Sequence, residues 1–235
     1  FGTNDIRNQT GGTTTADVQA DDTILENTAF KLNWQIVSAN SFVASWNNGD
    51  KNKFGRSAGP TRPAPTTWDQ RGPTAIYKFE DTHVFSSSFF LGGSYSKVDG
   101  GFSLVSKACI AAGSCADATE TAWDANGVWQ NSYLSGPSSR PSEEFKIDGS
   151  YFFNAGGSHE LKFGGRMREF STQSTFHWPG RDLFTVDGGF WAGLDAPTIA
   201  VVARRGEDSA PVKQEYTSFW VQDTMQFGKF TVNAG

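Results

Sequence analysis

The feature that most restricts the fold of this chain is a two-residue alternation of apolar and polar side chains. In residues 30–46, FKLNWQIVSANSFVASW, the even positions carry Phe30, Leu32, Trp34, Ile36, Phe42, Ala44 and Trp46. Successive side chains of a strand point to opposite faces, so this stretch predicts two strands with one apolar face. A three-residue loop at 38–40 would keep even positions opposite even positions. In that hairpin Leu32 opposes Trp46, and Asn40 closes the loop in the left-handed conformation.

The same alternation returns further along the chain, and about eight strands are expected in all. We expect one apolar face, made of Leu32, Trp34, Ile36, Phe42, Tyr77, Phe79, Phe89, Leu91, Tyr151, Phe153, Leu161, Phe163, Phe219 and Val221. The alternate positions are polar and carry the charged residues Lys31, Lys78, Glu80, Lys146, Asp148, Lys162, Arg166 and Arg168.

The connections between these strands alternate in length. Short ones are expected at 38–40, 81–86, 154–159 and 226–229, and long ones at 49–72, 98–142 and 175–210. A transmembrane β-barrel has short turns at one end and long loops at the other, and its strands need about 10 residues to cross a bilayer. The sequence therefore predicts an all-β, antiparallel transmembrane β-barrel segment whose apolar face contacts lipid. In the alternative, a second sheet covers that face, as in a soluble sandwich.

Composition excludes two other classes of protein. The longest apolar run, residues 199–203, is far below the roughly 18 residues of a membrane-spanning helix. A bundle of such helices is therefore excluded. The formal net charge of −5 and the scattered basic residues offer no surface for nucleic acid.

Cys109 and Cys115 are the two cysteines of the chain, in the stretch ACIAAGSC. A metal site would require further cysteine or histidine ligands nearby, and this loop has none. We expect a disulfide, which would indicate an oxidising compartment, with two free thiols as the alternative.

The sequence gives no sign of catalysis, so we expect neither an enzyme nor a cofactor. The spacings typical of serine hydrolases, zinc proteases and phosphate-binding loops do not occur. His83 and His159 fall in expected short turns and His177 in a long loop, so a common metal site is not expected. Adjacent carboxylates such as Glu143 and Glu144 would point to opposite faces of a strand.

Several tryptophans fall in the long loops rather than in the strands. They are Trp68, Trp123, Trp129, Trp178 and Trp191. Such residues either contact a bound solute or pack the loops against one another, and we favour packing. Residues that bind substrate cannot be assigned.

Six stretches resemble the barrel of TonB-dependent outer-membrane receptors, in particular the Oar-like branch. They are KLNWQI at 31–36, DKNKFGR at 50–56, RGPTAIYKFEDTHVFSSSFFLGGSYS at 71–96, GGF at 100–102, HELKFGGR at 159–166 and YTSFWVQDTMQFGKFTVNAG at 216–235. These are strand patterns rather than catalytic motifs, and together they cover most of residues 28–235.

The resemblance implies a larger protein in the bacterial outer membrane, with a barrel of about 22 strands. Residues 1–235 would be an interior part of that single barrel domain, with 1–28 as an extracellular loop. The signal peptide, plug and C-terminal strands would lie outside this sequence. The resemblance further implies transport of a bulky solute, driven by the TonB complex acting through the plug.

Two other functions remain open at this point. One is a secreted or surface all-β adhesin or carbohydrate-binding module. The other is a complete small barrel of eight strands, in which the first strand near Phe30 pairs with the last near Val232.

Overall fold

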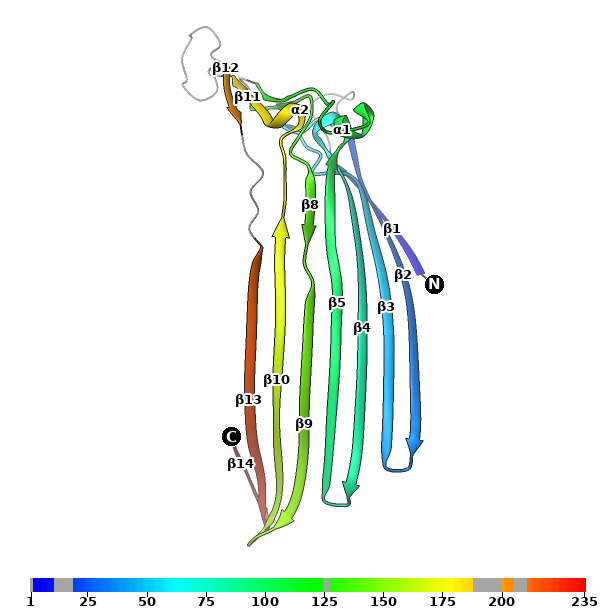
Figure 1. The fold of residues 1–235 in the computed structure, drawn as a ribbon, viewed down its shortest axis with the longest axis vertical. Helices are drawn as coiled ribbons and strands as arrows, with labels where there is room; N and C mark the ends of the chain where they lie inside the picture. The colour runs from blue at the N-terminus through cyan, green and yellow to red at the C-terminus, as the bar shows by residue number, and fades with distance from the viewer. Residues whose placement is uncertain (1, 11–18, 125–126, 188–199, 205–210) are drawn as a thin grey trace.

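The main element of the fold is one antiparallel sheet that follows the order of the chain (Figure 1). The computed structural model describes residues 2–10, 19–124, 127–187, 200–204 and 211–235. The sheet consists of β1 (Gly2–Thr10), β2 (Gln19–Val37), β3 (Asn40–Arg56), β4 (Trp68–Ser86), β5 (Phe89–Ser106), β8 (Gly136–Ser139), β9 (Ser142–Asn154), β10 (Ser158–Ser174), β13 (Val212–Phe227) and β14 (Phe230–Ala234). The expectation of an all-β, antiparallel fold is confirmed.

Each strand of the main sheet pairs with the strands that come before and after it in that sheet. Strands β8 and β9 follow each other and together occupy one place between β5 and β10. Within the described part of the chain, β1 and β14 form the two edges of the sheet. Strand β2 pairs with β1 and β3, whereas β14 pairs with β13. A closed barrel of eight strands would pair the strand near Phe30 with the strand near Val232. These strands do not pair in the described structure, so that prediction is wrong.

The first hairpin differs from its expected register. Its turn has two residues, Ser38 and Ala39, and Leu32 lies opposite Ala44 rather than Trp46. A two-residue turn would place even positions opposite odd ones, but the register shifts between Gln35 and Val37, which leaves Ile36 as an extra residue. This bulge restores the pairing of even with even positions. Asn40 pairs as an ordinary strand residue, and its φ is not positive.

The strands are longer than the sequence pattern predicted. Strands β2 to β5 have 17 to 19 residues each. The expected turn at 81–86 belongs to β4, so His83 lies within a strand, as does His159 near the start of β10. Within the expected loop at 1–28, residues 2–10 form β1 and residues 19–28 belong to β2.

The tight turns gather at one end of the sheet, the turn end, and the longer connections gather at the other, the loop end (Figure 1). The loop end carries a second sheet, which consists of β6 (Thr121–Trp123), β7 (Trp129–Gln130), β11 (Leu183–Asp187) and β12 (Ala200–Arg204). Beside it lie three short helices, η1 (Ala64–Thr66), α1 (Lys107–Ala112) and α2 (Pro179–Asp182). We call this assembly the loop cap. No helix in the described residues is long and apolar enough to cross a membrane.

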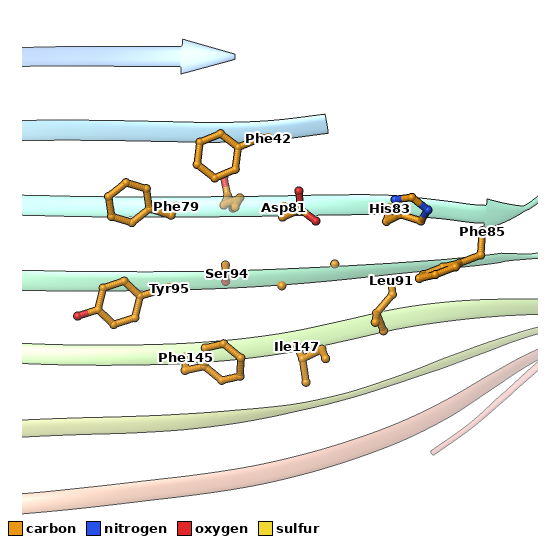
Figure 2. A pocket seen from close by; sticks show the side chains of 13 residues that line it. Phe42, Phe79, Asp81, His83, Phe85, Leu91, Ser94, Tyr95, Phe145 and Ile147 are labelled. Atoms are coloured by element: carbon orange, nitrogen blue, oxygen red, sulfur yellow. The ribbon is translucent and has the colours of Figure 1, made fainter. Parts of the chain in front are cut away.

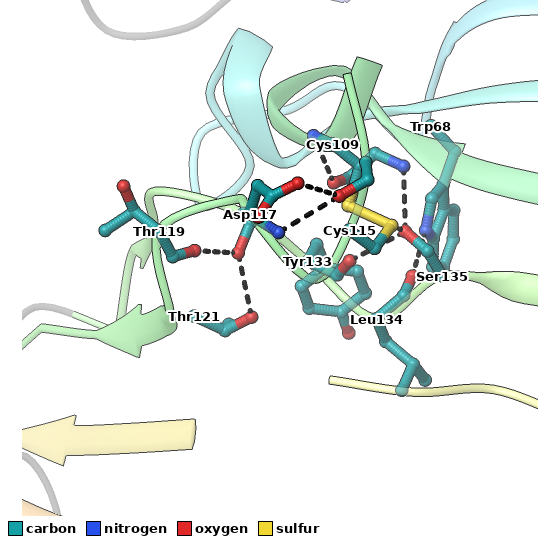
Figure 3. Close-up of a disulfide and its surroundings, with 12 residues drawn as sticks. Trp68, Cys109, Cys115, Asp117, Thr119, Thr121, Tyr133, Leu134 and Ser135 are labelled. Carbon is teal, nitrogen blue, oxygen red and sulfur yellow. Dashed lines mark hydrogen bonds between the residues drawn. A yellow bond between two sulfur atoms is a disulfide. The ribbon is translucent and has the colours of Figure 1, made fainter. Parts of the chain in front are cut away.

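The buried core lies in and beside the loop cap and contains the disulfide between Cys109 and Cys115 (Figure 3). Ser106 caps α1, since its hydroxyl accepts a hydrogen bond from the Cys109 amide. Gly113 ends the helix with a φ of 82°, a conformation that glycine adopts without strain. The Ser135 hydroxyl accepts from the Ser106 amide at 2.9 Å, which joins β5 to the loop before β8.

Reduction of the disulfide is expected to loosen the loop cap and leave the main sheet intact. Closing so short a loop stabilises a fold by about 2 kcal/mol in the chain-entropy account. We therefore expect Cys115→Ser to speed protease cleavage between β5 and β8. The strand signal in circular dichroism should not change. Loss of that strand signal in the variant would contradict this account, because α1 lies outside the main sheet.

Candidate membrane-facing surface

The register of the main sheet brings the fourteen expected apolar residues to one face. Residues directly opposite each other in neighbouring strands share a face. Across the middle of the sheet Phe79 pairs with Tyr95, Tyr95 with Phe145 and Phe145 with Met167. When the pairs are followed through all strands from β2 to β13, the same face carries Leu32, Trp34, Ile36, Phe42, Tyr77, Phe79, Phe89, Leu91, Tyr151, Phe153, Leu161, Phe163, Phe219 and Val221. We call this the apolar face.

The apolar face is accessible to solvent in this structure. All fourteen residues are exposed or half-buried, and Phe219 is 82% exposed and Trp34 55% exposed. Within the ranges that the structure describes, no second sheet packs over them. An apolar patch that extends over so many strands far exceeds the few hundred Å² that a soluble monomer normally exposes.

The opposite face carries the eight charged residues that alternate with the apolar ones. Three ion pairs form between side chains two positions apart on one strand: Lys78 with Glu80 at 2.7 Å, Lys146 with Asp148 at 2.6 Å, and Lys162 with Glu160 at 3.2 Å. This polar face also holds some apolar side chains, among them Ile76, Phe90 and Phe152. The two faces therefore differ chiefly in charge.

On the apolar face, charged side chains mark a margin toward the loop end. On one side of the sheet this margin contains Glu26 of β2, which lies opposite Asp50 of β3. On the other side it contains Glu143, Glu169 and Glu215, which face one another across β9, β10 and β13. These acids form ion pairs at the margin, for example Glu143 with Lys97 at 3.3 Å and Glu169 with Lys213 at 2.8 Å.

A second margin lies toward the turn end and contains Asp81 of β4 and Asp223 of β13. The residues paired in turn from Asp81 across β5, β9 and β10 lead to Phe219 of β13; we call such a set of paired residues a row. Asp223 lies four residues beyond Phe219, so this margin shifts by four residues across four strand spacings. The loop-end margin moves the same way. On β3 the loop-end margin lies at Asp50, which pairs with Pro73 of β4. On β5 and β9 it lies at Lys97 and Glu143, which are on the row of Tyr77, four residues closer to the turn end.

The turns follow the same slope, as Figure 1 shows at the turn end. Asn40, which begins β3, lies on the row of Val221, six residues before β13 ends at Phe227. At about 3.4 Å per residue and about 4.8 Å per strand spacing, these shifts correspond to strands inclined by about 35–40°. On β13 the band runs from Glu215 to Asp223, which gives it a height of about 22 Å. Transmembrane barrels have strands tilted by about 35–45° and an apolar band about 25 Å tall.

Aromatic rings cover two of the glycines on the apolar face. A Cβ atom on Gly149 would lie 2.9 Å from the Phe163 ring, and one on Gly165 would lie 3.0 Å from the Phe219 ring. These rings lie where a side chain on the neighbouring strand is missing, an arrangement that stabilises glycine within strands.

The loop tryptophans pack against one another in the loop cap. The rings of Trp123 and Trp129 stack with centroids 5.1 Å apart, and Trp178 stacks on Trp129 at 5.9 Å. Trp68 contacts Tyr133 edge to face and donates a hydrogen bond to the carbonyl of Leu134 at 2.6 Å (Figure 3). Packing of the loops thus describes Trp68, Trp123, Trp129 and Trp178. Trp191 lies outside the described residues.

Arg62 joins these aromatic rings. Its guanidinium carbon lies 4.2 Å from the centre of the Trp68 ring and 3.7 Å from that of Tyr133, and the group donates to the carbonyl of Thr66. Burial lowers the pKa of the Arg62 guanidinium from its ordinary value, and the electrostatic interaction with Tyr133 opposes that shift. The side chain stays charged at neutral pH. No sequence pattern indicated this contact, because Arg62 lies in an irregular loop.

The histidines lie apart from one another. His83 and His159 are near the turn end, whereas the backbone of His177 pairs with Ser135 at the loop end. In the part of the chain that the structure describes, no three His, Cys, Asp or Glu residues are placed to hold a metal ion.

Comparison with known proteins gave matches by structure only. No family model matches the chain, and no curated protein is similar to it in sequence. The crystal structure of the ferric citrate transporter FecA in the unliganded form matches 98% of this chain at 12% identity, with a TM-score of 0.56. BauA, the ferric preacinetobactin receptor from Acinetobacter baumannii, matches 97% of it at 9% identity, with a TM-score of 0.48. The chain spans about a third of the length of each structure, 33% and 34%. At this identity, the likeness to FecA shows the fold alone.

Replacement of Arg62 is expected to loosen the aromatic cluster of the loop cap. A cation held between two rings and shielded from water contributes about 2 kcal/mol. Arg62→Gln should therefore lower the stability of the loop cap by about that amount, measured by tryptophan fluorescence during denaturation. Arg71→Gln is the control, since Arg71 is exposed. Equal effects of the two substitutions would show that the ring contacts of Arg62 contribute nothing.

Proposed function

We propose that this chain forms part of the wall of a TonB-dependent outer-membrane receptor that transports a bulky solute. One observation carries this proposal. In the residues that the structure describes, a continuous face of fourteen apolar residues, bounded by charges on two inclined margins, is uncovered by protein, and charged residues occupy the other face. Lipid is the surrounding that suits such a face, because a Lys or Arg at the bilayer midplane would cost about 2–4 kcal/mol.

The fold likeness to the ferric citrate transporter agrees with this proposal. The sequence resemblance to the Oar-like branch supports the narrower assignment. In such a receptor the turn end faces the periplasm and the loop end faces outward. The edge strands β1 and β14 would pair with further strands of the same barrel, because lipid cannot satisfy the hydrogen bonds of open sheet edges.

Transport by such a wall needs no covalent chemistry. We propose that the solute contacts the polar face and the long connections of the loop end. The sequence predicted these connections at 49–72, 98–142 and 175–210; in the structure they follow β3, β5 and β10, and the first two begin later than predicted. The TonB complex would supply the driving force through a plug domain. The polar face suits contact with a hydrated solute, because its charged side chains remain accessible to water, as in the pair of Lys78 and Glu80.

A secreted adhesin or carbohydrate-binding module is the competing function. Such a module would have to cover its apolar residues with protein, and in the described ranges the apolar face is uncovered. The loop aromatics, which could have formed a flat sugar-binding surface, pack against one another instead.

Detergent dependence separates the two functions. We expect the complete protein to fractionate with the outer membrane and to need detergent above its critical micelle concentration to stay monodisperse in size-exclusion chromatography. The physical reason is that the apolar face must be kept from water. A monodisperse, folded protein without detergent would overturn the proposal.

A pair of neighbouring substitutions tests which face contacts lipid. Leu32 lies on the apolar face about midway between Glu26 and the turn at Ser38, and Asn33 lies on the polar face opposite Val43. We expect Leu32→Arg to lower the free energy of unfolding from lipid vesicles by about 2–4 kcal/mol. The matched control Asn33→Arg should cost less than about 1 kcal/mol. Similar costs for both substitutions would contradict a lipid-facing Leu32.

A further inference from the structure

The apolar face contains a recess of about 420 Å³ between β3, β4, β5 and β9, close to the turn-end margin (Figure 2). Aromatic side chains, including Phe79, Tyr95 and Phe145, lie on its loop-end side, and His83 and Phe85 lie on its turn-end side. The rings of Phe79 and Tyr95 stack at 6.5 Å.

The recess exists because Gly93 contributes no side chain and no ring covers it. A Cβ atom on Gly93 would have the Lys146 carbonyl oxygen, 4.0 Å away, as its one neighbour within 4 Å. Gly149 and Gly165, by contrast, are each covered by the ring of a phenylalanine. Gly93 therefore leaves a hollow that no neighbouring ring fills.

The recess also holds a carboxylate, that of Asp81, directly beside Gly93. Both Asp81 oxygens accept hydrogen bonds from the Asn40 side-chain amide, at 3.0 and 3.1 Å. In the described part of the chain Asp81 forms no ion pair. The nearby ring of His83 packs on Phe85 instead, with centroids 4.4 Å apart. Asp81 is exposed, so its negative charge is open to a ligand.

Asp223, the other carboxylate of this margin, has a partner of its own. Its Oδ2 lies 2.8 Å from Nδ1 of His159, whose ring stacks on Phe153 at 4.6 Å. The two aspartates thus occupy the same margin of the same face, but Asp223 lies against an ionisable histidine ring, whereas the partner of Asp81 is the neutral side-chain amide of Asn40.

We propose that this recess binds a phospholipid with a primary-amine headgroup, such as phosphatidylethanolamine. The ammonium group donates hydrogen bonds to Asp81, and the acyl chains extend along the Gly93 hollow toward the rings of Phe79 and Tyr95. An anionic headgroup is disfavoured by the carboxylate, and a choline headgroup has no N–H to donate. The proposal rests on the proposed membrane location of the apolar face, and it adds a specific lipid site to it.

Lipid titration followed by native mass spectrometry tests this site. The complete protein, purified in detergent, is titrated with phosphatidylethanolamine, phosphatidylcholine and phosphatidylglycerol that carry identical acyl chains. We expect the first lipid to bind most tightly. Asp81→Asn, which keeps the shape and removes the charge, should weaken its binding about tenfold and abolish the preference over phosphatidylcholine.

A second variant fills the hollow. Gly93→Leu should weaken the binding of all three lipids at this site, and the space around Gly93 admits the new side chain. Ser96→Leu is its control, because Ser96 lies on the polar face of the same strand and outside the lining of the recess. Asp223→Asn is the control for charge, and it should leave the preference for the amine headgroup unchanged.

The outcomes separate this proposal from the membrane assignment. Equal binding of the three lipids, a preference for phosphatidylglycerol, or an equal effect of Asp81→Asn and Asp223→Asn would overturn the amine-lipid site. The protein would still be a membrane protein if it fractionated with the outer membrane and needed detergent. A protein that is soluble without detergent would overturn the membrane assignment itself.

Discussion

The hydrogen-bonded register of the main sheet is the constraint on which the rest of the structure depends. Side chains alternate between faces with a period of two, so a slip of one residue between any two strands would invert every side chain beyond it. The register from β2 to β13 instead keeps all fourteen apolar residues together. The bulge at Ile36 shows how closely this is maintained, since it compensates for a two-residue turn. Without it Leu32 would lie on the face of Ser45.

The inclination of the apolar band follows from the same register. The turns, the aspartates at one margin and the ion pairs at the other all shift in one direction across the sheet. Three features set by different residues therefore define one band, about as tall as the hydrocarbon-facing band of a membrane barrel. Asp81 and Asp223 lie on its margin. At that position a carboxylate on the apolar face would be compatible with the proposed lipid around the band. In the described residues Asp81 has no cationic partner, and this distinguishes it from Asp223.

The loop end follows different physical rules from the strands below it. Its stability comes from a disulfide, a capped helical turn, buried serine hydroxyls and rings stacked around Arg62. These contacts resemble the core of a small soluble domain. Among the described residues, the sheet between the margins has no such core on either side: one of its faces exposes apolar side chains and the other exposes charged ones. The structure thus combines a protein-packed cap with a sheet whose apolar face requires a different environment.

The sequence by itself determined the antiparallel class and the membership of the apolar face, because each depends on side-chain period. It favoured a disulfide between Cys109 and Cys115 over free thiols, because the two residues are close along the chain. It could not determine the turn type near Ser38, the extra length of β2 to β5 or the contacts of Arg62. Strand ends and bulges depend on which partner carbonyl and amide groups are available across the sheet, and the two-residue pattern of one strand carries no information about its partner. Only the tertiary structure placed Gly93 beside Asp81, because those residues meet through the register of β4 with β5.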